Sequence, residues 1–245
     1  MTQSGDIRFS VPLYTVAEAA RYVRVPASTY ATWARGYDRS LPGRGGGQRH
    51  VHGAPVITAF TAPKRGWPTI PFVGLAESLV LSAFRMAGVS MQHIRLAIPV
   101  LAEQVGVEHA LASQRLYTDG AVILFDYATH GSVDQDAAEE LSGLTRIVDG
   151  QRVFAQVVRD YLHRVAYEED GWAGEIGLPY GSGNVLRVRP DRGGGKPLFV
   201  SGGAPLDAML ARWRAGDGIA ELAADFEVPP HDLEDALRGA VAAAA

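Results

Sequence analysis

The apolar positions near the start of the chain repeat with the period of an amphipathic helix, twice in close succession. The first pattern spans residues 14–23, where Thr15 can cap the helix and Glu18 follows three positions later, as in a capping box. The second pattern spans residues 27–35, begins after a proline and ends at Gly36. Two short helices joined by a tight turn predict a helix-turn-helix.

Further along the chain the hydrophobic pattern predicts mostly helices, with a few short strands. Residues 54–62 resemble a strand, and β-like pieces recur between residues 167 and 190. Helical patterns occupy residues 73–87, 90–105, 153–164, 205–214, 218–226 and 230–239, and residues 115–125 resemble a hairpin. We find no internal repeat in these patterns.

These elements predict an α+β, mostly helical fold in three parts. A winged helix-turn-helix occupies residues 10–66, with the strand at 54–62 as its wing. A helical middle region with small strands spans residues 67–190 and serves dimerisation or partner binding. The glycine-rich segment at 192–196 marks a linker or boundary, and a C-terminal trihelical module spans residues 191–241.

The composition is that of an ordinary folded protein of 245 residues, with 47% hydrophobic and 20% charged residues. The absence of cysteine excludes disulfides, thiolate catalysis, cysteine-type zinc fingers and iron–sulfur clusters. The N-terminus lacks the pattern of a signal peptide, and no apolar run reaches the roughly 18 residues that a membrane span needs. We therefore expect a cytoplasmic protein without membrane contact.

The net charge of −4 hides an asymmetry along the chain. Residues 1–67 hold 9 basic and 3 acidic residues, residues 68–189 hold 9 and 15, and residues 190–245 hold 5 and 9. A basic front on an acidic body can bind phosphate at one end and leave the other end for a different partner. This asymmetry favours DNA as the partner of the N-terminal part.

In a helix-turn-helix the second helix enters the major groove, and its first side chains meet the base edges. Basic residues after it can neutralise phosphates. The predicted DNA-binding residues are Ser28, Thr29, Tyr30, Thr32, Arg35, Arg39, Arg44, Arg49, Lys64 and Arg65. Because a two-fold protein reads a two-fold operator, we also expect a homodimer, with the apolar helices of 73–105 as a possible seam.

The N-terminal segment resembles the winged helix-turn-helix of MerR-type regulators. The residues that carry this resemblance are Tyr14–Ala20, Val25–Thr29 and Trp33–Tyr37, and the sequence departs from the pattern in the longer stretch 43–49. The resemblance implies a DNA-binding transcription regulator.

The C-terminal stretch resembles a small bacterial family called domain of unknown function 433. The matching segments are Gly195–Pro197, Phe199-Val200, Pro205–Trp213, Ala215–Asp217, Ile219–Phe226 and Pro229–Leu237, with a departure at Ser201–Ala204. Longer members carry a MerR-like helix-turn-helix and a middle section similar to Pro71–Val80 and Gly88–Arg95. The resemblance implies a VapB-type antitoxin that neutralises a PIN-domain ribonuclease toxin and represses its own operator.

The last predicted helix is acidic, with Asp232, Glu234 and Asp235 against Arg238, which favours a protein partner there over DNA. The alternative function is a stand-alone, MerR-like, ligand-responsive regulator with an effector pocket in its middle region. An enzyme is the third possibility, and no motif supports it: the glycine runs lack the Gly-Lys-Ser/Thr ending of a phosphate loop, and His50 and His52 have no third metal ligand nearby. We predict no catalytic residue, metal or cofactor.

Overall fold

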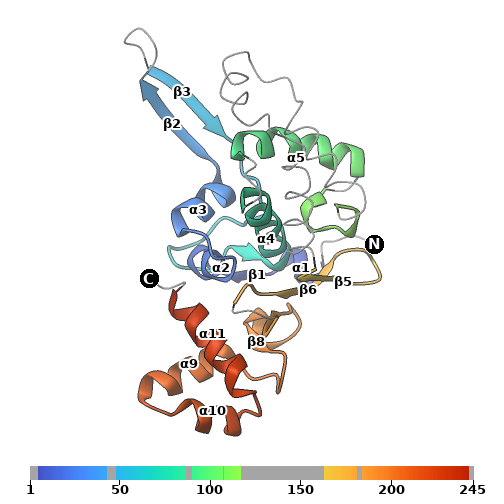
Figure 1. The fold of residues 1–245 in the computed structure, drawn as a ribbon. Helices are drawn as coiled ribbons and strands as arrows, with labels where there is room; N and C mark the ends of the chain where they lie inside the picture. The colour runs from blue at the N-terminus through green and yellow to red at the C-terminus, as the bar shows by residue number, and fades with distance from the viewer. Residues whose placement is uncertain are drawn as a thin grey trace, which may run out of the picture.

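The computed structural model describes residues 5–42, 48–86, 90–106, 108–116, 163–180 and 184–242. It mixes helices with short antiparallel strands, as the sequence predicts at the level of fold class (Figure 1). Much of the predicted middle region, residues 117–162, lies outside the described residues, as does the segment 43–47 with Arg44.

The described chain begins with four short elements of the N-terminal part. They are α1 (Ile7–Ser10), β1 (Pro12–Tyr14), α2 (Val16–Tyr22) and α3 (Ala27–Arg35). The first predicted helix starts two residues late relative to the pattern, because Tyr14 belongs to β1, which pairs with β4 (Ile70–Pro71). The second predicted helix has the predicted bounds.

A two-stranded antiparallel hairpin follows α3 and projects from the body of the protein (Figure 1). Its strands are β2 (Tyr37–Pro42) and β3 (Gln48–Gly53), in a register that pairs Tyr37 with Gly53 and Pro42 with Gln48. The strand predicted at 54–62 is wrong, since no strand is assigned there. These apolar residues instead pack as an extended segment: the backbone N–H of Val56 donates to the carbonyl of Trp33 at 2.8 Å.

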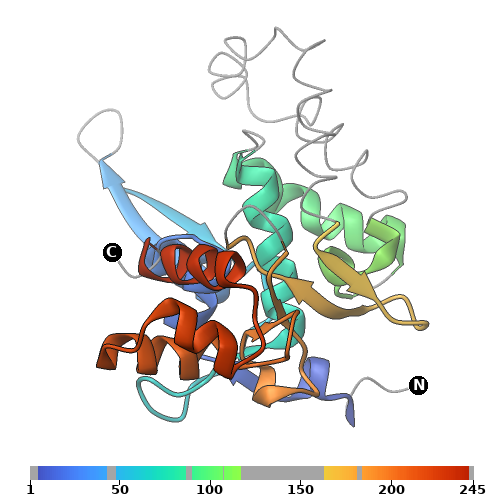
Figure 2. The same cartoon turned by 60° about the horizontal axis from the view of Figure 1, so that its bottom comes forward.

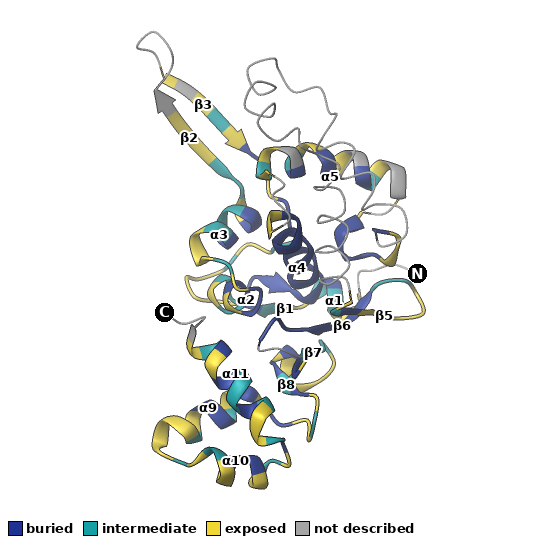
Figure 3. Ribbon diagram, in the orientation of Figure 1, coloured by how far each residue is buried: buried dark blue, intermediate teal, exposed yellow. Residues whose placement is uncertain are grey.

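The centre of the fold is α4 (Phe72–Met86), which is buried along its length from Phe72 to Phe84 (Figure 3). It packs against the short turn η2 (Ala110–Ala112), which also contacts α5 (Met91–Val105), and against α1, β1, β4 and β6. The helices predicted at 73–87 and 90–105 are confirmed within one residue at either end. Because the chain's own side chains cover α4, this helix offers no dimer seam.

A four-stranded antiparallel sheet lies beside this core. In spatial order it consists of β5 (Val165–Tyr167), β6 (Ala173–Gly177), β7 (Leu186–Val188) and β8 (Leu198–Phe199), with the turn η5 (Gly193–Gly195) between the last two. Since Phe199 pairs with Leu186, the sheet runs across the predicted division at 190/191. The glycine-rich segment is therefore a connection within a sheet, and its interpretation as a linker is wrong.

Three helices end the described chain: α9 (Leu206–Ala215), α10 (Ile219–Asp225) and α11 (Pro230–Ala242). They lie together on one side of the body, as Figure 2 shows. Their buried residues, such as Met209, Leu222 and Leu233, belong to the same continuous hydrophobic core as α2 and α4.

Candidate nucleic-acid interface

The turn between α2 and α3 has the hydrogen bonds of a tight helix-turn-helix. Thr15 and Glu18 form the predicted capping box, in which each side chain accepts the backbone N–H of the other residue. At the other end of α2, Arg24 adopts a left-handed conformation with φ 56°, and the N–H of Val25 donates to the carbonyl of Ala20 at 3.0 Å. The chain is thereby turned into α3 within four residues.

The inner face of α3 is held by the core of the protein. Tyr30, Trp33 and Ala34 are buried, and the ring centroids of Tyr30 and Trp33 lie 6.0 Å apart. The carbonyl of Trp33 accepts a hydrogen bond from the backbone N–H of Val56, in the segment that follows the hairpin. The hydroxyl of Ser82 on α4 donates to the carbonyl of Val23, in the turn before α3, at 3.4 Å. With these contacts, α3 presents a single outer face.

Four of the predicted residues lie on that outer face. Ser28 and Arg35 are exposed, and Thr29 and Thr32 are half-buried. The hydroxyl of Thr32 donates to the carbonyl of Thr29 at 2.7 Å, within the helix itself. Hydroxyls and a terminal arginine on one helix face are groups that can hydrogen-bond to base edges and phosphates.

Tyr30 does not belong to this face, and its predicted role in DNA contact is wrong. Its side chain is 0% exposed. Tyr30 precedes Trp33 and Ala34 by three and four positions, so it lies on the same inward side of the helix. Burial also raises the pKa of its hydroxyl well above the ordinary value for tyrosine.

The hairpin carries polar side chains on both of its strands. Asp38, Arg39 and Ser40 on β2 and His50 and His52 on β3 are exposed. Opposite pairs interact: His52 Nδ1 lies 2.9 Å from Asp38 Oδ1, and Ser40 Oγ lies 3.1 Å from His50 Nδ1. Arg49 is part of β3, but its side chain lies outside the described residues, as does the whole of Arg44.

Arg39 and a residue that the sequence did not single out, Arg95, both contact the ring of Tyr37 at the base of the hairpin. Their guanidinium carbons lie 5.2 and 5.1 Å from the ring centroid. Arg95, on α5, also donates from Nη2 to the carbonyl of Thr32 at 3.1 Å. Desolvation by the surrounding chain lowers the pKa of Arg95.

Arg95 thus joins α5 to the end of α3 and to the hairpin, and we interpret it as a positioning residue. Its only signal in the sequence is a basic residue within an apolar helical pattern.

Gly36 fixes the angle at which the hairpin leaves α3. Its φ is 73°, and a Cβ atom there would lie 2.3 Å from the carbonyl oxygen of Gly53. Only glycine fits both the left-handed conformation and this approach of the two strands. The glycine that ends the predicted helix therefore also sets the direction of the hairpin.

Lys64 and Arg65 lie in an exposed loop between the extended segment and β4. Two backbone hydrogen bonds close the base of this loop: the N–H of Phe60 donates to Thr69 at 2.7 Å, and the N–H of Thr69 donates to Tyr14 at 2.8 Å. The loop is thus attached to β1, directly before the helix-turn-helix. Trp67, in the same loop, is 54% exposed.

Within the described residues, no group of three or more His, Cys, Asp or Glu side chains is placed to hold a metal ion. In the same part of the chain, no helix is long and apolar enough to cross a membrane.

Comparison with known proteins agrees with this geometry. Residues 12–98, from β1 into α5, match the family described as "Putative DNA-binding HTH domain". The fold and the match define the class: a protein with an N-terminal DNA-binding helix-turn-helix domain.

Nearly the whole chain resembles one curated relative. It is 43% identical over 236 residues to the protein named "Putative antitoxin VapB45" of Mycobacterium tuberculosis (strain ATCC 25618 / H37Rv), with 96% of each chain covered. The chain belongs to the family of this antitoxin. It is also similar to the X-ray crystal structure of Rv2018 from Mycobacterium tuberculosis, with a TM-score of 0.73, 41% identity, and coverage of 94% of this chain and 99% of that one. The family match and the curated relative point to a regulator.

Proposed function

We propose that this chain is the antitoxin of a type II toxin–antitoxin pair, which binds a PIN-domain ribonuclease toxin and represses its own operator as a homodimer in the cytoplasm. The observation that carries the proposal is 43% identity, over 96% of both chains, to a relative named as an antitoxin. The exposed polar face of α3 supports the DNA-binding half of the function.

In this proposal the N-terminal part acts as a MerR-like winged helix-turn-helix. Ser28, Thr29 and Thr32 on α3 face the major groove, with Arg35 at the end of the helix against a phosphate. The hairpin β2–β3, instead of the segment at 54–62, is the wing, and Arg39 on β2 contacts the backbone of the DNA. Arg44 and Arg49, predicted from the sequence, remain further proposed phosphate contacts. Lys64 and Arg65 add phosphate contacts from the neighbouring loop.

The toxin is bound by the acidic part of the chain. Residues 190–245 hold 9 acidic and 5 basic residues, and the sequence of this part resembles the domain of unknown function 433. A ribonuclease needs a basic groove for its RNA substrate, so an acidic partner is attracted to that groove and blocks it.

Co-purification tests the proposal. The tagged chain is expressed together with the protein encoded by the neighbouring gene, and the size of the purified species is measured. A stable complex that silences a ribonuclease is the expected result. A chain that purifies alone, yet binds its own upstream DNA specifically, would overturn the antitoxin function and favour the ligand-responsive regulator.

A further inference from the structure

The turn between α10 and α11 repeats the turn between α2 and α3. In each, a left-handed residue follows the first helix: Arg24 with φ 56° and, 203 positions later, Glu227 with φ 54°. Three backbone N–H to carbonyl bonds recur at this same spacing, as Val23–Ala19, Arg24–Arg21 and Val25–Ala20 in the first turn and as Phe226–Leu222, Glu227–Ala224 and Val228–Ala223 in the second. The two turns therefore have the same backbone construction.

The helix after each turn is also buried in the same pattern. Residues 27–35 and residues 230–238 agree in exposure at every position: exposed, exposed, half-buried, buried, half-buried, half-buried, buried, buried, exposed. The inward positions are Tyr30, Trp33 and Ala34 in α3 and Leu233, Ala236 and Leu237 in α11. The outer face of α11 therefore takes the place of a recognition-helix face.

The two segments also share a weak sequence similarity. The expectation that the chain contains no internal repeat is therefore corrected. Between 16–36 and 219–239, seven positions are identical: 17/220, 18/221, 20/223, 25/228, 26/229, 35/238 and 36/239. These identities are scattered, and the intervening core residues differ in size. The matching hydrogen bonds and burial establish a second helix-turn-helix at the C-terminal end.

The two outer faces differ in charge. Where α3 has Thr29, Ala31 and Thr32, α11 has Asp232, Glu234 and Asp235. At the next exposed position α3 has Arg35 and α11 has Arg238. Over these four positions the net charge is +1 on α3 and −2 on α11. Arg238 pairs with Glu234 at 3.0 Å and with Asp235 at 3.6 Å, so it is already engaged within the helix. DNA phosphates would be repelled by this face.

We propose that the outer face of α11, which corresponds to the DNA-reading face of a recognition helix, binds a protein. Its partner is the basic, RNA-binding groove of the toxin. This inference rests on the proposed function and adds the surface that carries it. Charge complementarity selects the occupant, because a groove built for phosphates attracts carboxylates presented in a row on a helix.

The inner side of α11 is anchored to the body. On the outer face, Asp232 is half-buried: Ser201 Oγ donates to its Oδ2 at 3.5 Å, and His231 Nε2 lies 3.1 Å from its Oδ1. A Cβ atom on Gly239 would lie 2.6 Å from the ring of Tyr180, so the helix and this ring pack as closely as glycine allows. The hydroxyl of Tyr180 in turn donates to the carbonyl of Arg21 on α2 at 3.0 Å. Tyr180 thus connects the C-terminal part of α11 to α2 of the helix-turn-helix.

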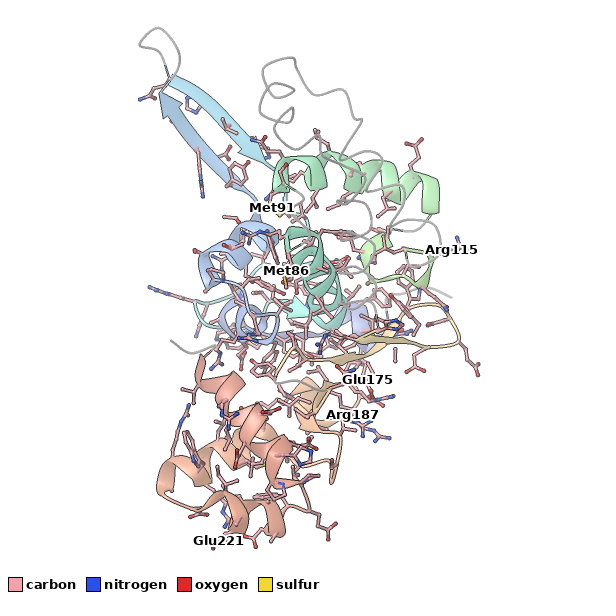
Figure 4. All side chains as sticks on the ribbon, viewed as in Figure 1. Met86, Met91, Arg115, Glu175, Arg187 and Glu221 are labelled. Atoms are coloured by element: carbon pink, nitrogen blue, oxygen red, sulfur yellow. The ribbon has the colours of Figure 1, made fainter. Side chains whose placement is uncertain are left out.

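The test uses the full chain and the protein encoded by the neighbouring gene as the probe. The variant Asp232→Asn/Asp235→Asn removes two charges from the outer face of α11 while keeping the side chains' size. Glu221→Gln is the control: Glu221 is exposed on α10, at the far end of the C-terminal helices (Figure 4), and occupies the place of Glu18 in the first helix-turn-helix. Thermal unfolding verifies that each variant is folded.

We expect the double variant to bind the probe about tenfold more weakly or worse at low salt, with a reduced salt dependence, while Glu221→Gln and operator binding stay near wild type. Unchanged probe binding by the folded double variant overturns the inference and leaves the antitoxin function standing. Weaker operator binding by that variant overturns it in favour of DNA contact by α11. Failure of the wild-type chain to bind the probe refutes the proposed function, and this inference falls with it.

Discussion

Removal of two arginines of the proposed DNA interface, Arg35 on α3 and Arg39 on β2, should lower operator affinity and weaken its dependence on salt. Both side chains are exposed, and neither forms an ion pair within the described part of the chain. Each phosphate contact contributes about −0.9 to the slope of log K against log salt, so the double variant to alanine should reduce the slope by about 1.8. Between 50 and 200 mM salt, wild type should then lose about 12-fold more affinity than the variant.

Fluorescence anisotropy with a labelled duplex from the chain's own upstream region, titrated at several salt concentrations, measures this slope. The control is Arg192→Ala/Arg214→Ala, which removes the same charge from two exposed positions in the C-terminal part. If the phosphate contacts lie at α3 and the hairpin, the control has the wild-type slope. Equal slopes for wild type and Arg35→Ala/Arg39→Ala, or an equal loss in the control, would refute the assignment of the interface.

Three further predictions test the geometry of the site and its support. Tyr30→Phe should leave operator affinity unchanged, because the side chain is buried; a loss in the same anisotropy titration, in a variant of normal stability, would return Tyr30 to the interface. Gly36→Ala should destabilise the fold by about 1–3 kcal/mol in urea unfolding and abolish operator binding, because its Cβ meets the Gly53 carbonyl; wild-type values for both would contradict the close approach. Burial lowers the pKa of His109, but its hydrogen bond to Glu77 and the charge of Glu77 outweigh burial and raise this pKa above 6.5. The protonated imidazole therefore stabilises the fold fully below about pH 6.5, and this contribution is lost as the pH rises through the folded-state pKa. His109→Gln should remove this pH dependence of the free energy of unfolding, measured by urea titrations at several pH values.

The sequence predicted the elements whose signals are local. The capping box of Thr15 and Glu18 requires only two residues at fixed spacing, and the structure has both of its hydrogen bonds. The bounds of α3 follow from a proline before it and Gly36 after it. The pattern of α4 is apolar over many turns because that helix is buried, whereas α5 repeats its buried residues Ile94, Ala97 and Leu101 on one face.

The hairpin could not be found by the same means. Asp38, Arg39 and Ser40 on β2 are exposed in succession, so this strand lacks the alternation of apolar and polar residues that marks a half-buried strand. Residues 54–62 have an apolar composition, but Val56 and Ile57 are buried within the hydrophobic core, with backbone N–H groups that donate to Trp33 on α3, and not by pairing in a sheet. Tertiary contacts decided both cases.

Burial of one residue within a polar run is also a tertiary effect. Tyr30 stands between Thr29 and Ala31 in a stretch that reads as a polar recognition helix, and only its spacing to Trp33 gives its inward direction. The second helix-turn-helix was hidden for a similar reason: its turn is defined by backbone hydrogen bonds, which scattered identities at a spacing of 203 residues do not reveal.

The most direct test of the antitoxin function is a ribonuclease assay with the purified protein of the neighbouring gene and increasing amounts of this chain. We predict that cleavage of RNA falls to background as the chain is added, and that about tenfold more of Asp232→Asn/Asp235→Asn is needed for the same effect. Cleavage that continues unchanged in an excess of the wild-type chain would contradict the account.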